Sequence, residues 1–252
     1  MSLSISERMR TEIQRAVSHC LFVFFCPLIV FLIRHKYKFQ VDNLKEMRKR
    51  YKLLVGSADG PVLICSNHLT LIDSIIQSAM LNSTFGYLIN FSLLPWNLPE
   101  KKNFNHKLHW KIICYLGKCI PVQRLAPPSV AKKSVSKMMY VLNKGDVLSI
   151  FPEGKRSRTG LVDDEDFSYG VGQLLKELPK AKVLCLYMRG KKNGCFADFP
   201  DRGEHFYLDM DLISPTSELK GMRKVRDLST QVIHKLKNME QEYFAHAVVR
   251  GE

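Results

Sequence analysis

The sequence predicts an α/β fold in which a largely parallel central sheet is flanked by helices and preceded by an apolar N-terminal, membrane-associating helical segment. Two observations predict this architecture. From residue 53 onward, short apolar runs alternate with stretches of helical periodicity, which is typical of parallel strands joined by crossover helices. Residues 16–33 contain no Lys, Arg, Asp or Glu, which favours a helix embedded in a membrane.

The first expected strand, residues 61–65, is an apolar run with Asp-Gly before it and Ser-Asn after it. Similar apolar runs predict further strands at 87–91, 120–122, 147–151, 183–188 and 205–210. Helices are expected where apolar residues recur every three or four positions, and two of them end near Gly117 and Gly145. The expected helices are 71–81, 106–116, 129–142, 171–177 and 225–243.

As a helix, residues 16–33 would be about 27 Å long, close to the roughly 30 Å of a bilayer core. Basic residues flank both ends and Pro27 lies inside the segment, whereas a simple span gathers basic residues on its cytoplasmic side. We therefore expect a kinked segment that enters one leaflet, with a full span and a soluble core helix as alternatives. A cleaved signal peptide is disfavoured because no small-residue cleavage site follows.

The net charge of +14 indicates a polyanionic partner. Five Lys and Arg residues between 45 and 52 stand against only Asp42 and Glu46. An anionic membrane surface is the favoured partner, because each such charge near it contributes about 1 kcal/mol. A solvated basic helix face is the alternative. A nucleic-acid partner is disfavoured because the sequence has no recognisable nucleic-acid-binding module.

The sequence predicts no metal site and no disulfides. Its seven cysteines include no Cys-x-x-Cys pair and most lie in apolar runs, so we expect reduced, buried thiols in a cytosolic compartment. An acidic run at 163–166 offers carboxylates for a divalent cation. Salt bridges to the preceding basic residues, or a solvated loop, are favoured over such a site.

A histidine and an aspartate follow the first expected strand. Asn67 and His68 come directly after it, and Asp73 lies five residues beyond the histidine. One continuous helix would place these two side chains about 140° apart, so they meet only if His68 lies in a loop and Asp73 in the first helical turn. The carboxylate would then fix the imidazole tautomer and leave the other ring nitrogen free to accept a proton. A structural alternative remains, because Thr70 and Asp73 also fit a capping box.

A second polar cluster follows the fourth expected strand. Lys155, Arg156 and Arg158 offer charge-assisted donors suited to phosphate oxygens. Gly154 allows a close approach of backbone to ligand, and Glu153 is suited to hold an arginine or to accept from a substrate hydroxyl. In parallel sheets, ligands bind beyond the carboxyl ends of the strands, where both clusters are expected. A basic surface loop is the alternative for the second cluster.

Together the two clusters resemble the motifs of the glycerolipid acyltransferase family, which includes bacterial 1-acylglycerol-3-phosphate acyltransferases. The pattern N-H-x-x-x-x-D is matched from Asn67 to Asp73. The pattern F-P-E-G-T-R-S-R is matched from Phe151 to Arg158, with Lys155 in place of threonine. The resemblance covers roughly residues 53–190.

Two further family segments are matched in part. The pattern P-V-x-R appears at Pro121 to Arg124 after Gly117, and F-x-x-G-V appears at Phe167 to Val171. The family strand that normally carries a proline is expected at 183–187, where this chain has V-L-C-L-Y. These departures bear on the acceptor more than on the reaction.

The resemblance implies an enzyme that moves a fatty acyl group from acyl-CoA or acyl-carrier protein to a hydroxyl of lysophosphatidic acid or a related phosphate-bearing glycerolipid. It implies His68 as the general base, oriented by Asp73, and no metal or other cofactor. The implied substrate-binding residues are Asn67, Arg124, Glu153, Gly154, Lys155, Arg156 and Arg158.

The expected organisation is a membrane-associating segment at 1–52 with a basic flank, followed by an acyltransferase catalytic domain at 53–252 on the cytoplasmic face of the membrane. Two alternatives remain open. One is the same chemistry on another lyso-lipid or on glycerol 3-phosphate. The other is a catalytically silent membrane lipid-binding protein that keeps the fold.

Overall fold

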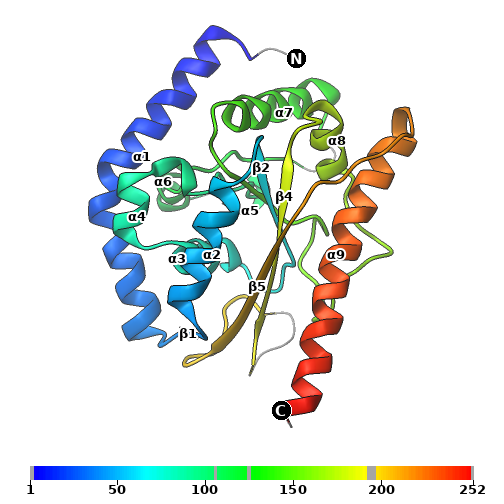
Figure 1. Ribbon diagram of the computed structural model, residues 1–252. Coiled ribbons are helices and arrows are strands. Elements are labelled where there is room, and N and C mark those ends of the chain that lie inside the picture. Colours follow the sequence, from blue (N-terminus) through cyan, green and yellow to red (C-terminus); the bar gives the residue numbers. More distant parts are fainter. Residues whose placement is uncertain (1–2, 105–106, 124–125, 192–196, 251–252) are drawn as a thin grey trace.

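The computed structural model describes residues 3–104, 107–123, 126–191 and 197–250. Figure 1 shows a central sheet with helices on both faces and a long N-terminal helix along one edge. Within the described residues the sheet has five strands in the order β1-β5-β4-β2-β3. They are β1 (Gln40–Val41), β2 (Val62–Ser66), β3 (Leu148–Ile150), β4 (Lys182–Gly190) and β5 (His205–Ile213).

The centre of the sheet is parallel, as predicted, and one side of it is not. Leu63 of β2 lies opposite Leu148 of β3 and Val183 of β4, and these three strands run in the same direction. β5 is antiparallel to β4. A parallel β5 would need a crossover helix to return the chain to the edge where β4 begins, and the described residues between the two strands contain no helix. β1 comes from the predicted segment 1–52 and pairs in parallel with β5. The domain boundary at residue 53 stays a prediction.

Helices account for most of the remaining described chain. The first, α1, continues into one π-helical turn at Leu32–Lys36. The α-helices are α1 (Ile5–Phe31), α2 (Leu44–Gly56), α3 (Asp73–Leu81), α4 (Thr84–Ile89), α5 (Lys101–Phe104), α6 (Leu108–Leu116), α7 (Pro128–Asn143), α8 (Gly170–Glu177) and α9 (Gly221–Arg250).

The alternation of side chains along β2 creates two apolar layers. Val62 and Ile64 pack with α2 and α3 on one face of the sheet. Leu63 and Cys65 pack with α7, α8 and α9 on the other. All these strand residues are buried, so β2 is apolar on both faces, as expected for an inner strand of a parallel sheet.

Two of the six predicted strands are wrong. Residues 87–91 lie in α4 and in a short 3-10 helix, Phe91–Leu93. Their apolar side chains pack at helical spacing, with Tyr87 and Phe91 both against Phe22 of α1. Residues 120–122 form no strand: only Val122 makes an isolated bridge, with Glu100, and the preceding Cys119 makes another with Asn97. In both places tertiary contacts override the local strand preference.

Polar side chains fix the buried side of α1 to the rest of the chain. The amide nitrogen of Gln14 donates to the carbonyl oxygens of Tyr115 and Cys119. One turn later, the hydroxyl of Ser18 also donates to the Tyr115 carbonyl. His19 stacks on the ring of Phe91. The helix therefore lies along the domain and makes specific hydrogen bonds with it.

Asp146 is the buried centre of a polar network between α1 and the sheet. Its carboxylate accepts from Trp96 Nε1 at 2.8 Å and from Arg15 Nε at 3.1 Å. Lys118 Nζ lies 3.5 Å away and donates to two backbone carbonyls. Burial lowers the pKa of Lys118 to about 7, although Asp146 partly opposes this shift. Three polar side chains in an apolar region, those of Trp96, Arg15 and Lys118, thus depend on one carboxylate.

Asp146→Ala should lower the free energy of unfolding by about 3–5 kcal/mol, because Lys118 would be left buried without its counter-charge. The measurement is urea unfolding followed by circular dichroism. Asp59→Ala is the control: it removes an exposed carboxylate that pairs with Lys182 and should leave the midpoint unchanged. Equal midpoints for both variants would contradict a stabilising role of the network.

Candidate active site

The two polar motifs meet because β2 and β3 are parallel neighbours. Cys65 of β2 lies opposite Ile150 of β3, so both strands end at the same edge of the sheet. His68 follows β2 after Asn67, and Phe151 follows β3 directly. Residues far apart in the sequence therefore come together beyond the carboxyl ends of the strands.

His68 and Asp73 are in contact. His68 lies in the loop after β2, and its Nδ1 is 3.0 Å from Asp73 Oδ2 at the first residue of α3. The spacing argument required this arrangement, although the helix begins at Asp73 itself and not at residue 71 as expected. The carboxylate is buried and also accepts from the backbone N–H groups of Leu69 and Thr70 and from the Thr70 hydroxyl. It therefore both orders the loop and orients the imidazole. A capping box is not formed, because the N-cap of α3 is Ile72 and the Thr70 hydroxyl donates to the Asp73 carboxylate.

The imidazole of His68 is fixed on a second side by an aromatic ring. It stacks on Phe151, with ring centroids 3.9 Å apart and planes inclined by 13°. Because an ionised carboxylate only accepts hydrogen bonds, the proton of a neutral His68 ring belongs on Nδ1. Nε2 is then an unprotonated base, and the side chain lines the large cavity described below.

The backbone of His68 is held at both ends by the second motif. Glu153 Oε1 accepts from the His68 N–H at 3.1 Å, and the Ser157 N–H donates to the His68 carbonyl at 2.8 Å. The other Glu153 oxygen accepts from the Asp163 N–H at 3.4 Å. Burial raises the pKa of Glu153 to about 7, and its two backbone donors oppose the shift in part.

Two of the predicted substrate-binding residues already make structural contacts within the protein. The side-chain amide of Asn67 exchanges two hydrogen bonds, each 2.9 Å long, with the backbone of Met188. Gly154 has a φ of +67°, and a Cβ there would lie 3.1 Å from that of Ser168. Glycine is suited to this turn, because other residues rarely adopt positive φ. Its backbone therefore approaches Ser168 closely, and Asn67 joins the loop to β4.

The basic residues of the second motif differ in how they are paired. Lys155 forms salt bridges with Asp163 (3.0 Å) and Asp166 (2.6 Å), which matches the favoured role of the acidic run. Arg156 donates to the exposed carboxylate of Asp198 at 2.7 Å. Arg158 is exposed, lines the cavity and has no hydrogen-bond or ion-pair partner within the described part of the chain. Arg124 lies outside the described residues.

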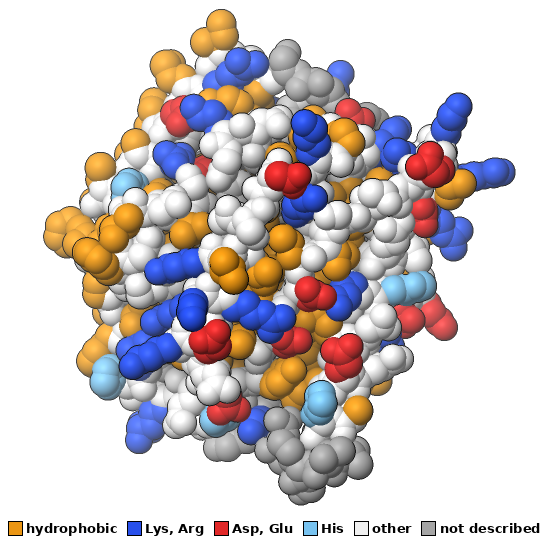
Figure 2. All heavy atoms as spheres, viewed as in Figure 1, with side chains coloured by type: hydrophobic (Ala, Val, Ile, Leu, Met, Phe, Trp, Pro, Cys, Tyr) orange, Lys and Arg blue, Asp and Glu red, His pale blue; other side chains and the backbone are white. Residues whose placement is uncertain are grey.

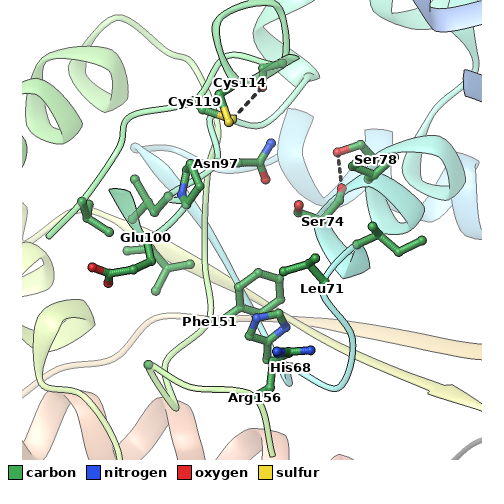
Figure 3. Close-up of a pocket in the computed structure, with 18 of the residues that line it drawn as sticks. His68, Leu71, Ser74, Ser78, Asn97, Glu100, Cys114, Cys119, Phe151 and Arg156 are labelled. Atoms are coloured by element: carbon green, nitrogen blue, oxygen red, sulfur yellow. Dashed lines mark hydrogen bonds between the residues drawn. The ribbon is translucent and has the colours of Figure 1, made fainter. Parts of the chain in front are cut away.

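A cavity of about 1250 Å³ lies beside His68. Figure 3 shows His68, Phe151 and Arg156 at one end of it, Leu71 and Ser74 on one side, Glu100 on the other side, and Asn97 toward the opposite end. Many other lining side chains are apolar, from α1 and α3 through α6 to α8; examples are Phe25, Ile29, Ile75, Ile113, Met138 and Leu174. A polar end and long apolar walls suit an amphipathic ligand.

Three residues at this site received no individual role from the sequence. Phe151 and Ser157 are part of the quoted motif, but only the structure shows that they hold the ring and backbone of His68. Asn97 lines the cavity, and its buried Oδ1 has no hydrogen-bond partner in the described chain. It lies in an irregular segment with no periodicity or motif, so no sequence signal marks it.

The described residues also bear on the metal and disulfide expectations. Six of the cysteines lie in this part of the chain, and all six are free thiols. Four of them are partly or fully exposed, so the thiols are not uniformly buried. Within the same residues, no group of three or more His, Cys, Asp or Glu side chains is arranged to hold a metal ion.

A comparison with protein families gives an independent result. The family model described as Acyltransferase matches residues 38–189 of this chain. The match includes both motifs and the strands that position them, β2, β3 and most of β4.

The pKa of Glu153 predicts a pH-dependent stability. Because the folded-state pKa is about 7 and the ordinary value is 4.5, the stabilising effect is complete below pH 4.5 and is lost as the pH rises through 7. Between pH 4.5 and 8, the wild-type protein should lose about 3 kcal/mol of unfolding free energy relative to Glu153→Gln, which does not titrate.

Urea unfolding of both proteins across this pH range measures the difference. Glu165→Gln is the control, because Glu165 is exposed, and its difference from wild type should not depend on pH. If the difference in unfolding free energy between wild type and Glu153→Gln also did not depend on pH, the Glu153 carboxyl would be solvated in the folded protein.

Proposed function

The chain belongs to the Acyltransferase family, the 1-acylglycerol-3-phosphate acyltransferase-like family, and from this premise we propose a specific reaction for it. An acyltransferase uses an acyl donor and, in this family, a lipid acceptor. We propose that the donor is acyl-CoA or acyl-carrier protein and that the acceptor is lysophosphatidic acid or a related phosphate-bearing glycerolipid. The observation that carries the proposal is the contact of His68 Nδ1 with buried Asp73, which leaves Nε2 as the base beside the cavity.

In the proposed reaction, His68 Nε2 takes the proton of the acceptor hydroxyl. The hydroxyl oxygen attacks the thioester carbonyl, an oxygen–carbon bond forms, and the carbon–sulfur bond breaks. The departing thiolate receives the proton from the imidazolium, which returns His68 to its starting state. Asp73 stabilises the imidazolium while it exists. This sequence of steps requires no acyl-enzyme and no metal ion.

The contacts of the basic residues suggest an order of engagement with the acceptor phosphate. Arg158 has no partner in the described chain and lines the cavity, so it is available for a phosphate oxygen at once. Arg156 would exchange the exposed Asp198 carboxylate for the phosphate. Lys155 stays with Asp163 and Asp166, and Glu153 and Gly154 shape the loop.

We further propose that α1 associates with the cytoplasmic face of an anionic membrane. Ile5–Lys36 is long and apolar enough to cross a membrane, and only 17% of its most apolar stretch is buried in the protein. One such helix weakly suggests membrane association by itself. The free thiols fit a reducing cytosolic compartment, and the surplus of basic residues fits anionic lipids.

His68→Ala should reduce acyl transfer by about 10²–10⁴-fold, the usual contribution of a general base. The measurement is thiol release from a long-chain acyl-CoA by membrane-bound protein, with and without lysophosphatidic acid. His109→Ala is the control, because His109 is exposed on α6 and does not line the cavity; it should keep full activity.

The outcomes separate the alternatives. Release that requires both His68 and lysophosphatidic acid supports the proposed reaction. Release that requires His68 and a different acceptor, such as glycerol 3-phosphate, supports the proposed chemistry and shows that the acceptor is another one. If neither the wild type nor the variant released thiol with any donor and acceptor, the result would favour a lipid-binding protein that has lost catalysis.

Arg158→Ala should raise the KM for the phosphate-bearing acceptor by about 10–100-fold, because one charge-assisted hydrogen bond contributes about 1.5–3 kcal/mol. Arg158→Lys should be intermediate, since it keeps the charge and loses the planar fork. Steady-state kinetics measures both. Lys180→Ala removes an exposed charge away from the cavity and should leave this KM unchanged, whereas an equal rise would indicate only a general effect of net charge.

A further inference from the structure

Three neighbouring helices expose large apolar side chains to solvent. On α4, Phe85 and Ile89 are 71% and 72% exposed, and on α6 Leu108 is 73% exposed. α1 packs against both helices and exposes Phe24 to a similar extent. The apolar face, as we call this surface, consists of Phe24, Leu28, Phe31, Phe85, Ile89, Leu108, Ile112 and Tyr115.

The exposed residues follow the helical repeat. Phe85 and Ile89 are four residues apart, and so are Leu108 and Ile112, so each pair lies on one side of its helix. Figure 2 shows hydrophobic side chains gathered along the edge of the molecule where α1 and α4 run in Figure 1. An exposed apolar patch that extends over several elements marks an interaction surface.

The inner sides of the same helices line the cavity next to His68. Phe25 and Ile29 of α1, Tyr87 of α4 and Trp110 and Ile113 of α6 all border it. One layer of helices therefore separates the cavity from the apolar face. A lipid on the outer side would lie within one helix diameter of the cavity.

A basic surface lies next to the C-terminal end of α1. Lys45, Lys49 and Lys52 are exposed at helical spacing on α2, and α2 packs in the same apolar cluster as Ile33. Exposed Lys111 lies among the apolar residues of α6. An apolar surface bordered by cations is complementary to a bilayer that contains anionic lipids.

The polar contacts of α1 decide how such a bilayer meets the helix. Gln14 and Ser18 donate to backbone carbonyls at the end of α6 and just beyond it, and Arg15 is paired with buried Asp146. A helix that crossed the membrane would leave the domain and break these bonds, leaving the buried Asp146 carboxylate without Arg15. The docked helix instead presents its outer side to one leaflet.

We propose that α1, α4 and α6 together form a membrane-binding face, on which α1 lies in the plane of one leaflet of an anionic bilayer. The apolar face enters the leaflet, and the α2 lysines contact lipid headgroups at its border. The proposal extends the membrane association suggested above for α1 to two helices of the catalytic domain. It rests on that association and is independent of the acyl-transfer chemistry.

Co-flotation with lipid vesicles tests the face. Phe85→Glu with Ile89→Glu, and Leu108→Glu with Ile112→Glu, should each lower the partition coefficient on phosphatidylcholine–phosphatidylglycerol vesicles by about tenfold or more. Leu219→Glu with Met222→Glu is the matched control, because these exposed apolar residues lie just before and within the first turn of α9, on the other side of the molecule; it should bind as wild type does.

The basic border has its own test. Replacement of Lys45, Lys49 and Lys52 by Gln should weaken binding to vesicles that contain phosphatidylglycerol and leave binding to pure phosphatidylcholine vesicles unchanged. His68→Ala should bind both like the wild-type protein, so a failure of catalysis and a failure of docking are distinguishable. Thermal unfolding in the absence of vesicles shows whether each variant is folded.

Depth measurements test the orientation. Tryptophan introduced at Phe24, Phe85 or Ile112 should be quenched to a similar extent by lipids brominated near the headgroup. Deep quenching of Phe24→Trp alone, with unchanged binding of the α4 and α6 variants, would overturn the proposal in favour of a span by α1. The proposal would also be overturned if the wild-type protein did not bind vesicles and instead formed dimers that the Phe85→Glu, Ile89→Glu double variant abolished. The apolar face would then bind a second copy of this chain.

Discussion

The backbone of His68 lies between two groups of another loop, and the geometry of the site depends on this attachment. Glu153 accepts its N–H, Ser157 donates to its carbonyl, and Phe151 supports its ring. Asp73 then fixes the one remaining freedom, the rotation of the imidazole. The attachment is possible because β2 and β3 are adjacent and parallel, so the loops that follow them leave the sheet at the same edge. The second motif thus fixes the position of His68 as well as lining the cavity beside it.

The same attachment has an energetic cost. A carboxyl as buried as Glu153 keeps its proton to higher pH than usual, and two backbone donors only partly compensate its burial. The loop gains order from neighbouring contacts, including Lys155 with Asp163 and Asp166. A cluster that looks uniformly cationic in the sequence therefore divides into internally paired residues and an outward-facing one, Arg158.

α1 has two different surfaces, and each has a physical consequence. Its buried side carries Gln14, Arg15 and Ser18, whose hydrogen bonds are specific to the domain. Its outer side is apolar and continuous with α4 and α6. A lipid substrate held in the leaflet beside such a wall would reach the cavity without passing through water, which suits an enzyme with a membrane lipid as acceptor.

The sequence by itself determined the family, the α/β class and the two motifs, because these depend on local patterns: apolar runs, helical periodicity and short spacings such as that between His68 and Asp73. It also located four of the six expected strands. It failed where long-range packing outweighs local preference, as at residues 87–91, which became helical against Phe22.

Only the tertiary structure decided the roles of individual polar residues. Asn67 binds the Met188 backbone, Glu153 holds His68, and Arg158 has no partner among the described residues; their residue types alone allow any of these contacts. The physical reason is that a side chain's partner depends on which distant segment the fold places beside it. The parallel pairing of β2 with β3 and the docking of α1 are such placements, and no short window of the sequence contains both partners.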